Sequence, residues 1–412
     1  MNVYLNRREK LLESLPENAC LVLFSGKAVM KSEDEGYPFS VNRSFYYFTG
    51  LDTEGMVLMF SKLNGVASAR LYILPYDEYL AKWVGGRMQA DEAYEISAIE
   101  EIYDIDEFKD TFATMYNRSR LNGGFDLYLD LWHYNWDQVN NETTKFCKEV
   151  QEKYPTIVIK DAFALLTNLR LIKDEYEVSC IKHALAITKA GIENMMHTIR
   201  PKQNEMFMEG VFNFTLMRNL CNENAFKTIA ASGKRATVLH YSQNNCVMED
   251  GELFLCDLGA THKHYCADIS RTFPVNGKFS ERQKEIYELV LQAQKIVEAN
   301  AKAGVRHRDL NKLVVDFYRE ELPKHGLNKD VSEYYFHGVS HHLGLDTHDS
   351  DGGLGAVLKA GMVITNEPGL YIEDENIGIR IEDDLLITED GNINLAADII
   401  KEVDDIEAFM NK

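Results

Sequence analysis

Two aspartates stand in a segment whose other residues predict a buried β-hairpin. Leu253–Leu258 is a short apolar run that contains Asp257, and Tyr265–Thr272 is a second candidate strand that contains Asp268. The six residues between these strands, GATHKH, are typical of a turn that joins antiparallel neighbours. Because side chains alternate between the two faces of a strand, such a hairpin can bring both carboxylates to one face.

Buried carboxylates need a positive charge beside them. A lone carboxylate costs several kcal/mol to bury, and about 20 kcal/mol in the idealised limit. No Lys or Arg occupies an inward position beside either aspartate in the two predicted strands. The hairpin therefore predicts a site for a divalent metal ion.

Three later segments supply further candidate ligands. Residues 337–349, HGVSHHLGLDTHD, hold four histidines among glycines, and this density indicates a loop that presents imidazoles. Residues 362–369, MVITNEPG, place Glu367 at the end of an apolar strand. Residues 377–387 form one predicted strand, on one face of which lie Arg380, Glu382 and Asp384.

These carboxylates and imidazoles make an oxygen-rich set of ligands. Four carboxylates would neutralise two divalent ions, and a set that includes one or two imidazoles suits Mn²⁺, Co²⁺ or Zn²⁺. Pairs of such ions activate water for hydrolysis. The residues therefore predict a two-metal hydrolase.

Composition sets limits on partners and location. A chain of 412 residues predicts two domains, and the formal net charge of −21 argues against nucleic acid or an anionic membrane as a partner. The seven cysteines are scattered without a CxxC pair, which predicts reduced thiols. The first residues lack an apolar segment and no run approaches 18 apolar residues, so we expect no signal peptide, no membrane span and a cytoplasmic protein.

Strands alternate with helices along residues 1–160, which predicts a small α/β domain. The expected elements of this domain are helix 6–15, strands 20–24, 56–60, 69–74, 127–131 and 156–159, and helix 137–154. In residues 161–412 the expected elements around the hairpin are helices 173–199, 205–222, 280–303 and 308–322 and strand 226–231. The helix at Ser280 begins with a capping box, Ser280-Glu-Arg-Gln283.

With these motifs assembled, the sequence resembles the pita-bread metallopeptidases, and among them the Xaa-Pro aminopeptidases (aminopeptidase P) more than prolidase. The second domain is similar in order through LHY, DLG, DISRTFP, HGVSH, LDTHD, NEPG and GIRIEDD, and the first through NRSFYYFTG and KWVGGR. The resemblance implies an α/β (α+β) protein. A small N-terminal domain of the creatinase/prolidase type, residues 1–160, would precede a catalytic pita-bread domain, residues 161–412.

The resemblance also implies the roles of individual residues. The family's five metal ligands correspond to Asp257, Asp268, His341, Glu367 and Glu382, with Asp268 and Glu382 at the positions that bridge two metals. Residues that hold substrate or stabilise charge correspond to His240, His337, His348 and Arg380. We expect Glu367 to accept the proton of the attacking water, and His348 and His240 to donate to the developing oxyanion.

The implied activity is a metal-dependent exopeptidase that cleaves between an N-terminal residue and a following proline. The expected cofactor is two divalent ions, Mn²⁺ in the first place and Zn²⁺ or Co²⁺ as alternatives, and the expected assembly is a homodimer or a higher homo-oligomer. Prolidase, which accepts only dipeptides, is the alternative activity. Creatinase-like hydrolases and non-catalytic modules of the same fold are a further alternative, but they lose the metal ligands. The chain departs from the family pattern at Thr347 and Ser350–Asp351, and His342 is an additional imidazole that we expect to be a bystander.

Overall fold

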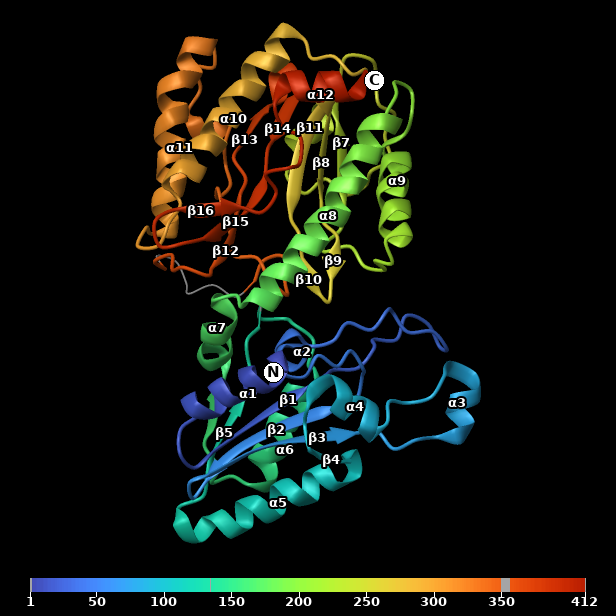
Figure 1. Cartoon of the computed structure of the whole chain (residues 1–412), viewed down its shortest axis with the longest axis vertical. Coiled ribbons are helices and arrows are strands. Elements are labelled where there is room, and N and C mark those ends of the chain that lie inside the picture. Colours follow the sequence, from blue (N-terminus) through green and yellow to red (C-terminus); the bar gives the residue numbers. More distant parts are fainter. Residues whose placement is uncertain (1, 134, 350–355, 412) are drawn as a thin grey trace. The chain divides into compact units, whose positions relative to one another are not determined.

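The computed structural model describes residues 2–133, 135–349 and 356–411, so Ser350 and Asp351 lie outside the described residues. The chain divides into two compact units, Met1–Leu169 and Arg170–Lys412, and both mix helices with strands (Figure 1). Helix α7, Phe163–Leu171, lies where the chain passes from one unit to the next. The domain ranges 1–160 and 161–412 therefore stay a prediction.

A six-stranded sheet forms the centre of the first unit. Its strands, in spatial order, are β4 (Glu101–Asp104), β3 (Val66–Ile73), β2 (Val57–Leu63), β1 (Ala19–Phe24), β5 (Asp126–Leu129) and β6 (Ile159–Asp161). Only β2 runs antiparallel to its neighbours, and the other adjacent strands are parallel. This mixed sheet agrees with the α/β pattern expected from the sequence.

Helices cover this sheet with a largely aromatic core. Those that bury residues are α1 (Val3–Ser14), α2 (Arg43–Thr49), α4 (Ala90–Ser97), α5 (Phe108–Ser119) and α6 (Glu142–Lys153), whereas α3 (Glu78–Val84) buries none. Phe108 and Phe112 of α5 pack against Phe146 of α6 with ring centroids 5.3 and 5.4 Å apart. Such aromatic pairs bury large apolar areas in few residues.

The second unit contains several small antiparallel sheets. One sheet has the order β11 (Ile269–Pro274), β8 (Leu253–Leu258) and β7 (Ile229–Ser232), and another has the order β12 (Val363–Asn366), β15 (Asp383–Ile387) and β16 (Asn392–Asn394). Two ribbons complete the set, β13 (Gly369–Ile372) with β14 (Ile377–Arg380) and β9 (Thr261–His262) with β10 (Tyr265–Cys266).

Helices flank these strands on two sides, with α10 and α11 at the left of the strands in Figure 1 and α8 and α9 at the right. Their bounds are α8 (Glu175–Thr198), α9 (Glu205–Arg218), α10 (Glu281–Asn300), α11 (His307–Glu321) and, near the end of the chain, α12 (Val403–Met410). The capping box predicted at Ser280 is confirmed, because the Ser280 side chain accepts from the backbone N–H of Gln283 and Gln283 reaches back to Ser280.

The hairpin that carries the two aspartates is interrupted, although one uninterrupted second strand was expected. Residues 265–266 pair with β9, and the main ladder resumes only at β11, where Ser270 lies opposite Asp257. Asp268 is therefore on the face of Asp257, as alternation predicts. Its backbone N–H donates to Asp384 at 3.2 Å instead of joining the ladder, which explains the interruption.

The prediction of one continuous strand over residues 377–387 is wrong. The chain leaves β14 after Arg380 and enters β15 at Asp383, and these two strands belong to different sheets. Arg271, fully buried, holds the junction by donating to the carbonyl of Glu382 at 2.5 Å and to the Asp383 carboxylate at 2.6 Å. A buried ion pair with β11 thus stabilises the junction at which the chain changes sheets.

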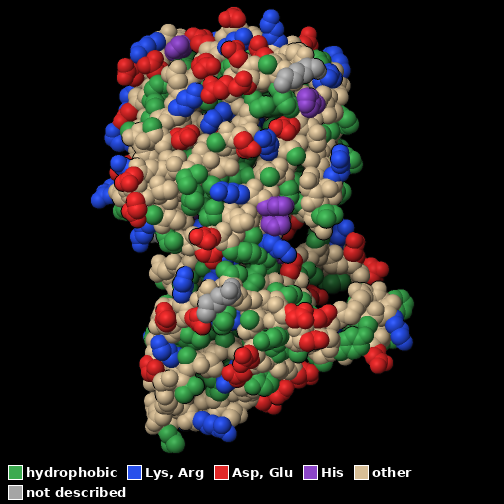
Figure 2. Space-filling view, in the orientation of Figure 1, with side chains coloured by type: hydrophobic (Ala, Val, Ile, Leu, Met, Phe, Trp, Pro, Cys, Tyr) green, Lys and Arg blue, Asp and Glu red, His purple; other side chains and the backbone are tan. Residues whose placement is uncertain are grey.

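The surface carries the mixture of charged side chains that is usual for a globular protein. Acidic and basic side chains are interspersed over the visible face in Figure 2. All seven cysteines are free thiols, as expected. None of the helices in the described ranges has the length and apolar composition of a membrane-spanning segment.

Gly259 offers a test of the interrupted hairpin. A Cβ atom at this position would lie 1.8 Å from the carbonyl oxygen of Ala267, and a backbone atom cannot rotate away. We expect Gly259→Ala to cost about 1–3 kcal/mol and to lower the melting temperature. In the control Gly210→Ala, on α9, the new Cβ meets open space, so the melting temperature should stay the same or rise. Equal melting temperatures for the two variants would contradict this account of the hairpin.

Candidate metal centre

All nine predicted site residues line one cavity of about 550 Å³ in the second unit. They come from five regions of the chain: the loop after η3 (Gly233–Thr237), the interrupted hairpin, the histidine loop, the end of β12 and the β14–β15 junction. The nine are His240, Asp257, Asp268, His337, His341, His348, Glu367, Arg380 and Glu382. The tertiary structure therefore brings together all nine predicted site residues.

The centre of the cavity combines carboxylates with one imidazole. Asp268, His341 and Glu382 each offer a ligand atom, and the three atoms lie within 4.8 Å of one another. The Nε2 atom of His341 is 3.4 Å from a carboxylate oxygen of Asp268 and 3.5 Å from one of Glu367. One imidazole surrounded by oxygen ligands is a composition that divalent transition metals accept.

These acids are held in a state that favours a cation. Burial raises the pKa of Asp268 and of Glu382 well above the usual range, and the neighbouring carboxylates raise both further. Burial also raises the pKa of Glu367 to about 8, against the opposing effect of Arg380. A divalent ion would remove this penalty, because it compensates several carboxylates at once.

Asp257 has a basic partner from outside the two predicted strands of the hairpin. Arg380, which arrives from β14, places Nη2 2.7 Å from Asp257 Oδ2. The other oxygen, Oδ1, is buried and has no hydrogen-bond partner among the described residues. A buried acceptor without a donor is energetically unfavourable, so Oδ1 of Asp257 is suited to bind a metal ion. The contact of Asp257 with Arg380 is therefore compatible with the predicted metal site.

Arg380 joins the acids to the substrate side of the cavity. Its Nε donates to Ser270 Oγ at 2.8 Å, and Ser270 donates in turn to Glu382 at 2.7 Å. Its Nη1 donates to the hydroxyl of Tyr371 at 2.8 Å, and this hydroxyl is 2.9 Å from Nε2 of His337. Sequence reasoning missed Ser270 and Tyr371. The position of Ser270, two residues after Asp268 on the same strand face, was a usable signal, whereas Tyr371 had none.

His341 is oriented by its neighbours as a ligating histidine usually is. Its Nδ1 is 3.1 Å from the carbonyl of His342, which directs Nε2 toward the acids. Its backbone N–H donates to Thr365 Oγ1 at 3.0 Å, and the Thr365 hydroxyl lies 3.3 Å from Glu367. Burial, and then His348, lower the pKa of His341 to about 3, so the ring is neutral and able to bind a metal.

His348 stacks on His341 with ring centroids 4.1 Å apart. The next residue, Asp349, is buried against Arg170 at 2.5 Å and Lys173 at 3.2 Å. Two buried cations on one carboxylate hold this end of the histidine loop in place. Burial lowers the pKa of His348, so its imidazole is neutral at neutral pH and can donate an N–H.

The remaining lining of the cavity includes three apolar side chains. Phe226, Ile229 and Leu239 line it beside His240. His342, the additional imidazole, is buried and is not among the described residues that line the cavity. Its part as a bystander stays a prediction.

Comparison with known families decides the classification. Residues 179–389 match metallopeptidase family M24, and residues 4–122 match the N-terminal domain of aminopeptidase P. The chain belongs to metallopeptidase family M24. The first match contains all nine residues that line the candidate centre.

Relatives of this M24 metallopeptidase cover nearly its whole length. The Xaa-Pro aminopeptidase of Haemophilus influenzae is 34% identical over 98% of this chain and 96% of its own. A proposed aminopeptidase P from Bacillus anthracis has a similar structure, with a TM-score of 0.96 and 43% identity over 99% of this chain and 98% of that one.

Aminopeptidase P of Escherichia coli, in a structure with the inhibitor Pro-Leu, gives a TM-score of 0.89 at 31% identity, again over 99% of this chain and 98% of that one. The E. coli protein is also known in a zinc-substituted form with product. These similarities confirm the predicted fold class, an N-terminal α/β domain of the aminopeptidase P type and a pita-bread metallopeptidase domain.

Metal removal should make the stability of this M24 metallopeptidase depend on pH. In the metal-free chain the folded-state pKa values of Asp268, Glu367 and Glu382 lie above the value of about 4 for unfolded carboxyls. The native state then retains protons that the unfolded state releases, so these three acids lower stability as pH rises toward about 8. The buried imidazoles of His337 and His341, with pKa values of about 4 and 3, act in the opposite direction only below the unfolded value of about 6.5. We expect the melting temperature of chelated protein to be lower at about pH 8 than at about pH 6.5, a range in which only the acids change their protonation. The metal-loaded protein is the control, and a chelated protein equally stable at both pH values would contradict the account.

Proposed function

We propose that this M24 metallopeptidase is an exopeptidase that hydrolyses the bond between an N-terminal residue and a following proline. The observation that carries the proposal is a single cavity lined by the acid–imidazole cluster and three further histidines. The family match, and relatives over the whole chain that are Xaa-Pro aminopeptidases, support the same activity. The prolidase alternative is not favoured by these relatives.

We further propose that the metal ligands are the five predicted ones, Asp257, Asp268, His341, Glu367 and Glu382. The unpartnered Oδ1 of Asp257 and the close approach of Asp268, His341 and Glu382 support this set. Four carboxylates match the charge of two divalent ions, and Mn²⁺ is the expected metal, with Zn²⁺ or Co²⁺ as alternatives. Divalent ions bound there would polarise the peptide carbonyl and acidify water.

The chain's own residues would move the protons of the reaction. Water adds to the carbonyl carbon of the first residue, the bond to the proline nitrogen breaks, and that nitrogen takes up a proton. Glu367 is the proposed base, because its carboxylate lies in the cavity beside the other acids, with Oε1 3.5 Å from Nε2 of His341. The nearby hydroxyl of Thr365 holds its Oε1.

The histidines would act on the substrate. His348 is proposed to donate an N–H to the developing oxyanion, together with His240, because its ring is neutral and rests against His341. His337, fixed by Tyr371, and Arg380, fixed by Asp257, would hold the substrate on the other side. The apolar wall of Phe226, Ile229 and Leu239 could receive a pyrrolidine ring by shape, since the bond before proline has no N–H to recognise.

The assembly and location are also proposals. A homodimer or higher homo-oligomer and a cytoplasmic location remain the expectations drawn from the sequence. The seven free cysteines are consistent with a reducing compartment.

Substitution of two neighbouring histidines should separate binding of metal from stabilisation of the transition state. His341→Ala should lose metal. His348→Ala should keep its metal and lose about 10²-fold in kcat, as the removal of an oxyanion donor does. Metal analysis and kinetics on the two purified variants provide the test. A metal-depleted or fully active His348→Ala variant would show that the roles are wrongly assigned.

Peptide specificity tests the activity itself. Metal-reconstituted protein should release the first residue from Xaa-Pro-Yaa peptides and leave matched Xaa-Ala-Yaa peptides largely intact. Cleavage confined to Xaa-Pro dipeptides would establish the prolidase alternative, and no cleavage of any Xaa-Pro peptide would refute the proposed function. Metal content measured on the same active sample checks the expected two ions per chain.

A further inference from the structure

In the loop that follows η3, some side chains line the cavity and others form hydrogen bonds on the side away from it. Leu239, His240 and Ser242 line the cavity. Tyr241, between them, instead directs its hydroxyl to the carboxylate of Glu205, at 2.8 Å. Glu205 is the first residue of α9 and lies outside the set that lines the cavity.

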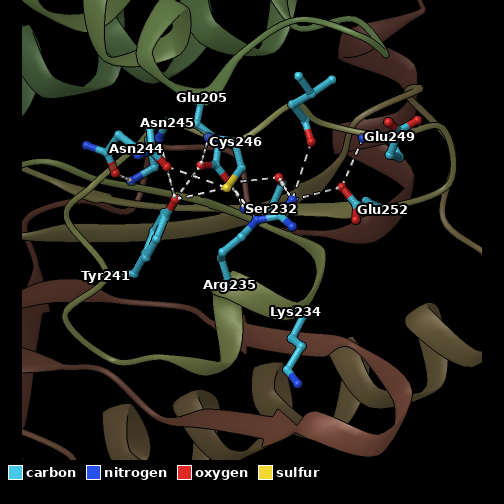
Figure 3. Close-up of polar contacts among 12 residues, drawn as sticks. Glu205, Ser232, Lys234, Arg235, Tyr241, Asn244, Asn245, Cys246, Glu249 and Glu252 are labelled. Atoms are coloured by element: carbon cyan, nitrogen blue, oxygen red, sulfur yellow. Dashed lines mark hydrogen bonds and ion pairs between the residues drawn. The ribbon is translucent and has the colours of Figure 1, made fainter.

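Glu205 is a buried carboxylate saturated with donors (Figure 3). Its side chain is 0% exposed. Oε1 accepts from the backbone N–H of Ser232 and from its hydroxyl, both at 2.8 Å, and from Nε of Arg235 at 3.1 Å. Oε2 accepts from the hydroxyl of Tyr241 at 2.8 Å and from the backbone N–H of Cys246 at 2.9 Å. Arg235 places a positive charge beside this buried carboxylate.

We propose that Glu205 is a positioning residue, which sets the place of His240 in the cavity by clamping Tyr241 and Cys246 at the back of the loop. The inference rests on the proposed function, in which His240 acts on the substrate. His240 is joined directly to Tyr241, so any movement of the Tyr241 backbone displaces the imidazole. Glu205 itself touches neither substrate nor metal in this account.

Two anchored residues restrict the conformation of the loop that carries His240. At one end the Tyr241 ring packs on the small core of Ile229, Ala231, Ala236 and Leu255. At the other end Asn244 is buried with a positive φ of 48°, donates to the carbonyl of Thr228 at 2.8 Å and accepts from the N–H of Ala230 at 3.0 Å. His240 directly precedes the first of these anchors, and Glu205 bonds to both Tyr241 and, through the N–H of Cys246, the segment after Asn244.

Placement of His240 matters because it shares its surroundings with His348. Both imidazoles line the cavity that holds the proposed metal ligands. Donors to a developing charge act only in a narrow geometry, so a displacement of about 1 Å can cost up to 10²-fold in rate. A clamp that prevents such a displacement would raise kcat without adding a contact to the substrate.

The first test removes a single hydroxyl from the clamp. Tyr241→Phe keeps the ring in its apolar cluster and breaks only the contacts of its hydroxyl, so the protein should fold and keep its metal. On Xaa-Pro-Yaa peptides we expect kcat to fall about tenfold, with KM changed much less, as for a misplaced donor. The matched control is Tyr287→Phe, which removes a buried hydroxyl bound to the carbonyl of Lys401 at 2.8 Å, away from the cavity, and should leave kcat unchanged.

The second test asks whether the loss passes through His240. If Glu205 and Tyr241 act only by placing His240, then Tyr241→Phe combined with His240→Ala should be no slower than His240→Ala alone. Glu205→Gln, a second variant that keeps the size of the side chain, should behave in the same way. Multiplied losses in the double variant, or a Tyr241→Phe variant as fast as wild type, would overturn the clamp.

Failure of the proposed function gives a different pattern. A wild-type protein that cleaves no Xaa-Pro peptide removes the activity. A fully active His240→Ala variant would refute the proposed role of His240 in catalysis and, with it, the positioning role of Glu205. When His240→Ala is slow while Tyr241→Phe and Glu205→Gln are both normal, only the clamp is refuted.

Discussion

Mutual repulsion among buried carboxylates is the interaction that governs metal binding in the second unit. Asp257, Asp268, Glu367 and Glu382 share one cavity, and burial raises the pKa of the last three. Arg380 neutralises part of this charge through Asp257, but it reaches only one oxygen of that residue. The remaining negative charge makes the folded state a ready binding site for divalent ions, so metal affinity and stability are linked.

A surrounding network of hydrogen bonds fixes the orientation of these charged groups. Ser270, Tyr371 and Thr365 each hold a group of the centre by a hydrogen bond, while a buried ion pair with Asp349 holds the end of the histidine loop. Each of these partners lies on a different strand, helix or loop from the group that it orients. Such outer contacts narrow the range of orientations of a ligand, which is how a protein prepares a site before the metal or substrate arrives.

Local features of the fold could be predicted from the sequence because they depend on neighbouring residues. Alternation along the hairpin placed Asp257 and Asp268 on one face, and the capping box placed the start of α10 at Ser280. The expected continuous strand over residues 377–387 failed for the opposite reason. Arg271, more than a hundred residues earlier, binds the junction and divides it between two sheets.

The sequence by itself determined the chemistry of the site: which acids and imidazoles are available, that their number suits divalent ions, and, through motif resemblance, which family they serve. Only the tertiary structure decided how they are paired. The contact of Arg380 with Asp257, that of Tyr371 with His337 and that of Glu205 with Tyr241 each join separate elements. The physical reason is that residue type and spacing govern propensity over a few residues, whereas a contact across the fold exists only after many elements have packed together.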